Sequence, residues 1–347
     1  MTFSVPRVDI SAYVTEGTAE QRAEVARQID SACRSVGFIQ IVGHRVPESI
    51  TSAFVAAMDN FFALDLEEKK TYRTPPSINR GYSPPKSEAL SLSLGVESAN
   101  RMNDFFEAFN VGATAADYPA SPGLPEIEYA DNVWPNVPGF EESVTAYFAE
   151  AARVARTLTT IFGHALGLEE NFFAERTGHS LDILRMNNYA LPPGTDIALD
   201  GDLTGMGEHT DFGIVTVLWA DQVRGLQVLG QDGGWNDVEP DDGAFLVNLG
   251  DVTARLTNER WMSTLHRVKP PIINGTIERR RSAAFFHDGD LDAVIDVLPS
   301  CIDDEHPALY APVTVGEHIT AKLKGSRAGV INTDAQRESA RVLSSKR

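Results

Sequence analysis

Two histidines and one aspartate in this chain of 347 residues are spaced as metal ligands. His209 and Asp211 flank a single threonine at the start of a predicted β-strand. Residues two apart on an extended chain project to the same side, so this imidazole and carboxylate are expected to converge on one point. His266 opens a later predicted strand and can supply a third ligand. The spacing therefore predicts a mononuclear metal site.

The type of these ligands indicates which metal chemistry to expect. Two imidazoles and one carboxylate on one side of an ion leave coordination positions open, which is typical of non-haem iron(II) oxygenases. The open positions can take a chelating co-substrate and dioxygen. The plainer alternative is that His209 and His266 are ordinary half-buried histidines. His287, which ends a predicted core strand, is the best substitute ligand.

A second candidate feature is the basic run that enters the predicted strand 280–286. Side chains alternate along a strand, so Arg280 and Ser282 share one face while Arg279 and Arg281 share the other. If Ser282 faces the interior, Arg280 does too, and a buried arginine needs a partner. A guanidinium with a nearby hydroxyl suits one end of a dicarboxylate. We expect Arg279 and Arg281 to be solvated surface charges.

The predicted elements that position these residues divide the chain into a mainly helical first half and a β-rich second half. Apolar residues at helical spacing predict helices over 20–36, 47–63 and 139–167 in the first half. After about residue 180, short β-rich runs separated by turn residues are typical of a β-sandwich or barrel. The predicted strands are 38–42, 105–111, 183–189, 213–219, 225–229, 244–249, 264–269 and 280–286, and a short helix follows from 316.

Composition narrows the class of protein. The formal net charge of −19 disfavours nucleic acid, because such binding depends on Lys and Arg neutralising phosphates. The two cysteines exclude a disulfide framework and a cysteine-based zinc or iron–sulfur site. No apolar stretch approaches the roughly 20 residues that span a bilayer, and the first residues lack the pattern of a signal peptide. We therefore expect a cytoplasmic protein with a small-molecule substrate and no membrane partner.

Taken together, the motifs resemble the isopenicillin N synthase-like family of iron(II)/2-oxoglutarate-dependent oxygenases over nearly the whole chain. The resemblance is carried by ordered segments that include Gly37-Phe-Ile-Gln-Ile-Val-Gly43, Arg185-Met-Asn187-Asn-Tyr189, His209-Thr-Asp211-Phe-Gly213, His266-Arg-Val268 and Arg280-Arg-Ser282. It implies a distorted double-stranded β-helix, or jelly roll, mainly β with α. Residues 1–178 would form an N-terminal helical support, 179–300 the jelly-roll core and 301–347 a C-terminal helical arm, in one structural unit.

The resemblance also implies residue roles. His209, Asp211 and His266 would bind Fe(II). Arg280 and Ser282 would hold the distal carboxylate of 2-oxoglutarate, assisted by Asn187 and Tyr189. The residues on the substrate side would be Asn103, Phe105, Glu107 and Phe286.

The implied reaction uses O2 and 2-oxoglutarate to oxidise, most simply to hydroxylate, a C–H bond of a small organic substrate, with release of succinate and CO2. The aromatic and apolar residues of the predicted strand 105–111 indicate, through the same resemblance, a small organic substrate from specialised metabolism. One departure from the family is the longer segment 270–277, which we expect to be a lengthened hairpin loop. Another is Asn188, which stands where an aromatic residue is common.

Three alternatives stay open at this point. Some relatives keep the Arg-x-Ser pair yet act as oxidative cyclases or oxidases without 2-oxoglutarate. A zinc-dependent hydrolase or a non-catalytic ligand receptor could also be built on a jelly roll. The prime substrate, the outcome after C–H cleavage and the oligomeric state are not defined by the sequence.

Overall fold

The computed structural model describes residues 3–85, 87, 94, 106–190, 205–270, 272–273 and 276–328. Its largest element is an eight-stranded sheet in the order β1-β2-β10-β7-β14-β5-β4-β3. These strands are, in that order, Arg7–Asp9, Phe38–Val42, Phe245–Leu249, Val215–Ala220, Arg280–His287, Asp182–Tyr189, Glu107–Gly112 and Gly81–Ser83. Four of the eight come from the chain before residue 179, so the N-terminal region helps to build the sheet as well as to support it.

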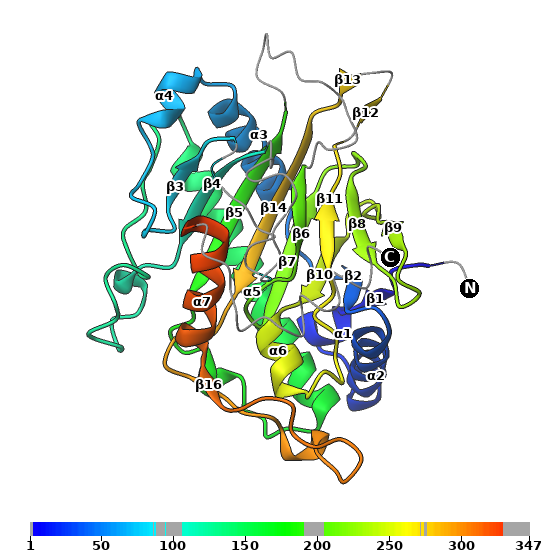
Figure 1. Ribbon diagram of the computed structural model, residues 1–347. Helices are drawn as coiled ribbons and strands as arrows, with labels where there is room; N and C mark the ends of the chain where they lie inside the picture. Colours follow the sequence, from blue (N-terminus) through cyan, green and yellow to red (C-terminus); the bar gives the residue numbers. More distant parts are fainter. Residues whose placement is uncertain are drawn as a thin grey trace.

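A smaller sheet faces the main one and completes the sandwich. Its order is β6-β11-β8-β9, with bounds Met206–His209, His266–Val268, Leu226–Leu229 and Trp235–Asp237. Two short hairpins pair β12 (Ile272–Ile273) with β13 (Thr276–Ile277) and β15 (Val294–Ile295) with β16 (Val313–Thr314). The first of these confirms the lengthened hairpin expected between β11 and β14. Both sheets are visible in Figure 1, and together they form the expected jelly-roll core.

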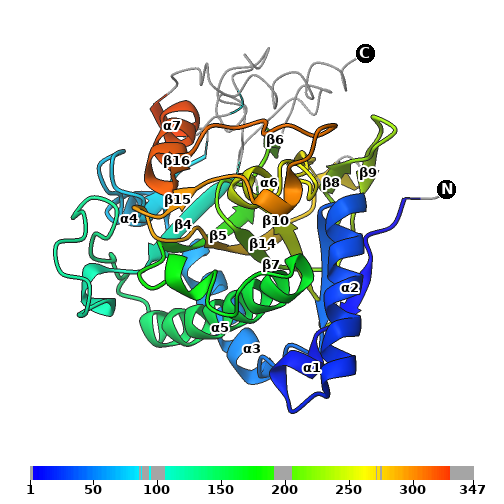
Figure 2. The ribbon, with the colours of Figure 1, turned by 90° about the horizontal axis from the view of Figure 1, so that it is seen from below.

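Helices cover one face of the main sheet. α2 (Ala19–Ser35), α3 (Glu48–Phe62) and α5 (Phe140–Leu166) lie on that face, whereas α7 (Val315–Ala328) lies on the opposite side (Figure 2). The remaining helices are the short α1 (Ser11–Val14), α4 (Leu66–Lys70) and α6 (Asp251–Leu256). The bounds of the three long helices agree with the predicted ranges to within one residue. α2 begins with a capping box formed by Thr18 and Gln21, as its sequence favours.

Strand alternation gives the main sheet two different faces. On β14, Ala283 and Phe285 point to the helices and are fully buried. Phe285 packs edge-on against Phe148 of α5, with ring centroids 5.0 Å apart. Burial of such a side chain contributes roughly 1.5–3 kcal/mol. The alternate residues Arg280, Ser282 and Phe286 line a cavity on the other face.

No helix among the described residues is both long and apolar enough to cross a membrane.

Candidate active site

Neighbouring strands of the smaller sheet bring the two histidines together. His209 is the last residue of β6, His266 is the first residue of β11, and the two are directly paired across the antiparallel ladder. Asp211 lies beyond β6, in the segment that crosses to β7 in the main sheet. The expectation that His209 and Asp211 open one continuous strand is therefore corrected. They converge because the chain changes sheets between them, not because of strand periodicity.

The three ligand atoms surround one point. His209 Nε2 lies 3.8 Å from Asp211 Oδ1, and His266 Nε2 lies 3.7 Å from the same oxygen. All three side chains are buried, and the ligand atoms lie within 4.8 Å of one another. His287, the alternative ligand, is not in this group. It faces the helices, and its Nδ1 lies 2.7 Å from Asp182 Oδ1.

Hydrogen bonds orient each of the three groups. His209 Nδ1 lies 2.9 Å from the Gly207 carbonyl oxygen, and His266 Nδ1 lies 3.1 Å from that of Thr264. Because a carbonyl can only accept, each Nδ1 carries the proton and each Nε2 keeps its lone pair toward the centre. Burial, and then His266, lowers the pKa of His209 to about 3, so this imidazole is neutral at physiological pH. The donor set thus fits a divalent cation such as Fe(II).

Two residues to which the sequence analysis gave no role fix the carboxylate. Thr216 Oγ1 donates to Asp211 Oδ2 at 2.5 Å, and Asn248 Nδ2 donates to the same oxygen at 2.7 Å. Both residues stand on the cavity face of the main sheet, on β7 and β10, where they are cross-strand partners. Asp211 Oδ1 is therefore left for a metal. The signal that could have found Thr216 is its alternation with apolar Val215 and Val217.

Arg280 is a fully buried cation whose charge is not compensated by any carboxylate in the described part of the chain. It is 2% exposed, and its Nε has no hydrogen-bond partner. Its Nη1 lies 3.4 Å from Ser282 Oγ, and its guanidinium lies over the Tyr189 ring at 5.1 Å. No carboxylate of the described residues pairs with it. Burying such a charge is costly, so the site fits an anionic ligand. Arg281, on the other face, instead pairs with Asp59 and Asp221 at 2.7 and 3.2 Å.

The three candidate metal ligands and Arg280 line the same cavity, which has a volume of about 720 Å³. Asn187, Tyr189 and Phe286, all predicted from the sequence, line it as well. Its other walls are largely apolar and are lined by Ile183, Phe212, Leu218 and Leu291, and by Ile319 and Leu323 of α7. A second acid also lines it. Asp288 follows the end of β14, and burial, followed by Asp182 and Asp211, raises its pKa well above the usual range.

Glu107 lies on the helix-facing side of β4, not in the cavity. Its carboxylate accepts hydrogen bonds from Lys69 Nζ at 2.8 Å, Tyr82 Oη at 2.5 Å and Asn188 Nδ2 at 2.8 Å. The phase of this strand is the reverse of the one expected, and Asn110 is the β4 residue that lines the cavity. Asn103 and Phe105 lie outside the described residues.

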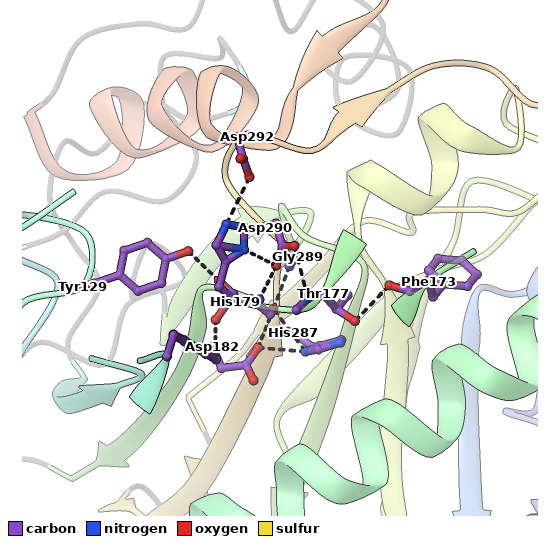
Figure 3. Close-up of polar contacts among 12 residues, drawn as sticks. Tyr129, Phe173, Thr177, His179, Asp182, His287, Gly289, Asp290 and Asp292 are labelled. Carbon is purple, nitrogen blue, oxygen red and sulfur yellow. Dashed lines mark hydrogen bonds and ion pairs between the residues drawn. The ribbon is translucent and has the colours of Figure 1, made fainter. Parts of the chain in front are cut away.

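A second cluster of possible ligand groups joins His179 to the segment after β14 (Figure 3). His179 Nδ1 lies 2.8 Å from Asp290 Oδ1, while its Nε2 lies 3.3 Å from Asp292 Oδ1. One ligand atom from each of the three residues lies within 4.8 Å of the others, but Asp292 is exposed and exposed acidic groups commonly lie together without a metal. Asp290 also accepts hydrogen bonds from the backbone of Gly178 and His179. The cluster is an anchor for the segment after β14.

The chain matches two family models and is similar to known oxidoreductases. Residues 5–137 match the family model for the N-terminal region of non-haem dioxygenases in morphine synthesis, and residues 181–289 match that of the 2OG-Fe(II) oxygenase superfamily. A 2-oxoglutarate-Fe(II) type oxidoreductase, hxnY of Emericella nidulans, is 34% identical over 92% of this chain and 90% of its own.

Solved structures agree with the sequence matches. A full-length Neurospora crassa protein in complex with alpha-KG and thymine is 25% identical, with a TM-score of 0.78 over 92% of this chain and 96% of its own. JOX2 in complex with 2OG, Fe and JA is 27% identical, with a TM-score of 0.72 over 98% of this chain and 88% of its own.

Proposed function

Because the chain belongs to the family of iron(II)- and 2-oxoglutarate-dependent oxygenases, we propose that it hydroxylates a C–H bond of a small organic molecule in the cavity described above. It is a dioxygenase that uses Fe(II), 2-oxoglutarate and O2. In this proposal His209, Asp211 and His266 hold the iron, and Arg280 with Ser282 holds the distal carboxylate of 2-oxoglutarate.

One observation carries the assignment of residues. A complete set of oriented, buried ligands and an uncompensated buried arginine open into one cavity. Either feature alone could be structural. Together they match the two charges of an iron(II) and 2-oxoglutarate pair, a cation held by a carboxylate and an anion held by a guanidinium.

The chain's own residues bind, orient and exclude water. When bound, iron and 2-oxoglutarate activate dioxygen for oxidation of the substrate, with release of succinate and CO2. Thr216 and Asn248 keep one oxygen of Asp211 occupied, which directs the other to the metal. The carbonyls of Gly207 and Thr264 fix the imidazole tautomers. Phe212, Phe286 and the inner side of α7 shield the reaction from bulk water.

Isotope incorporation tests the hydroxylase assignment. Small organic molecules are first screened for substrate-dependent succinate release, and the reaction of each positive compound is repeated under ¹⁸O₂. Hydroxylation predicts a product that has gained one ¹⁸O atom. A product that has lost two hydrogens without gaining the label would contradict hydroxylation and indicate desaturation or ring closure.

A further inference from the structure

Asp288 is a buried carboxylate that the binding of iron and 2-oxoglutarate leaves unused. It lines the cavity and is 8% exposed. Among the described residues, none donates a hydrogen bond to it or pairs with it. The charged groups that act on it most strongly are two further acids, Asp182 and Asp211. Its Oδ1 also lies where a Cβ on Gly213 would be, so only glycine leaves room for it.

The residues next to Asp288 in the chain, unlike Asp288 itself, form hydrogen bonds or ion pairs with other described residues. His287 is bonded to Asp182, and the backbone N–H of Gly289 donates to Ser180 Oγ at 2.9 Å (Figure 3). Asp290 is held by His179 and by two backbone N–H groups. The chain on both sides of Asp288 is therefore fixed, so the carboxylate is held in place at the cavity wall.

The register of β14 places Asp288 and Arg280 on opposite sides of the strand level at which Asp211 is held. Thr216, which binds Asp211, is paired with Phe286. Arg280 lies six residues before that level, or about 20 Å along the strand, and Asp288 lies two residues after it, or about 7 Å. A 2-oxoglutarate that reaches from the iron toward Arg280 leaves the side of Asp288 free for the prime substrate.

Charge and shape together restrict what this side can bind. A buried carboxylate without a partner is costly, and a cation from the ligand offsets that cost better than a neutral donor does. The net charge of −19 favours the approach of cations. The nearby walls, which include Phe212, Phe286 and Leu291, are apolar.

We propose that Asp288 binds a protonated amine of the prime substrate, which is therefore a small molecule with an apolar body and one ammonium group. This inference rests on the proposed function and names its substrate class. Asp288 would position the target C–H bond by holding the charged end of the molecule beyond the iron.

Matched ligand pairs test the assignment by binding rather than turnover. Phenylalkylamines and the phenylalkanols of the same carbon skeleton are titrated calorimetrically, without oxygen, into protein loaded with Fe(II) and 2-oxoglutarate. The wild type is compared with Asp288→Asn, with Asp288→Ser as a second neutral replacement. Glu128→Gln is the matched control, because Glu128 also lines the cavity but is only half-buried. It loses the same charge.

We expect amines to bind the wild type and Glu128→Gln about tenfold or more tightly than the alcohols do. In both Asp288 variants this ratio should fall to about one. An unchanged ratio in these variants, or no preference for amines in the wild type, or no binding of any amine, would overturn the inference. The optical band of the iron–2-oxoglutarate chelate is read in the same samples. Its absence from the wild type would refute the proposed function instead.

Discussion

The two faces of the main sheet differ in how far their buried charged groups are paired. On the helix-facing side, Glu107 has three hydrogen-bond donors, and His287 is bonded to Asp182. On the cavity side, Arg280 lacks a counter-ion and Asp288 lacks a donor among the described residues. Both sets stand on the same few strands. Paired charges are expected to stabilise the fold, and a buried charge without a partner marks where a charged ligand can bind.

The largest effect is expected from Asp211→Ala, on the cavity side. The variant should lose stoichiometric Fe(II) binding, because two neutral imidazoles remain where a charged ligand is needed. Metal analysis after anaerobic loading checks this, with circular dichroism of the metal-free variant as the control for folding. Undiminished iron on the variant would refute the triad.

Lys69→Met should have the largest effect on stability, because it breaks the helix-facing network. It leaves the Glu107 carboxylate buried without its cation, which typically costs about 3–5 kcal/mol. Urea unfolding measures this loss, and iron and 2-oxoglutarate binding by the folded variant should be unchanged. Lys70→Met is the control, since Lys70 pairs with an exposed Glu67 and its removal should cost well under 1 kcal/mol. Equal losses in both variants would show that the network is not a stabilising one.

Arg280→Ala should weaken 2-oxoglutarate about 100-fold while iron binding is retained, because only the co-substrate needs the guanidinium. Anaerobic titration of the iron-loaded protein measures both affinities. Arg281→Ala is a matched control one residue away, on the helix-facing side, and should leave 2-oxoglutarate affinity unaltered. If both variants bind 2-oxoglutarate as the wild type does, the anchor lies elsewhere.

A smaller effect is expected from pH. Burial, the largest cause, lowers the pKa of His318 on α7 from 6.5 to about 4. The unfolded chain then binds a proton below pH 6.5 that the folded chain does not, so stability falls as pH drops from about 6.5 toward 4. At pH 5 this loss is on the order of 1–2 kcal/mol. Urea unfolding of metal-free wild type and His318→Gln at pH 7 and pH 5 should show a weaker pH dependence in the variant. Identical dependences would contradict the assignment.

How far the sequence predicts the structure depends on the length of each signal. The helices 19–35, 48–62 and 140–166 carry several turns of periodic pattern, and their predictions are confirmed. Three-residue strands such as β1, β3 and β9 are too short to show alternation and were not predicted. The order of strands depends on pairing between distant segments, which no local pattern encodes.

The candidate site follows the same division. Residue type and spacing were enough to predict four site residues, which the structure places around one cavity: His209, Asp211, His266 and Arg280. Residue type and spacing did not predict which face of a strand each side chain occupies. A shift of one residue moves a side chain to the other face, and for this reason Glu107 was expected in the cavity but faces the helices. The roles of Thr216 and Asn248 depend on cross-strand register and could be seen only in the folded chain.

The most direct test of the contrast between the two faces is an anaerobic optical titration of metal-free protein with Fe(II) and then 2-oxoglutarate. The account predicts a visible charge-transfer band that needs both additions, is lost in Asp211→Ala and requires far more 2-oxoglutarate in Arg280→Ala than in Arg281→Ala. A band of equal strength in all these proteins, or no band in the wild type with iron bound, would contradict the assignment of the cavity side as the ligand site.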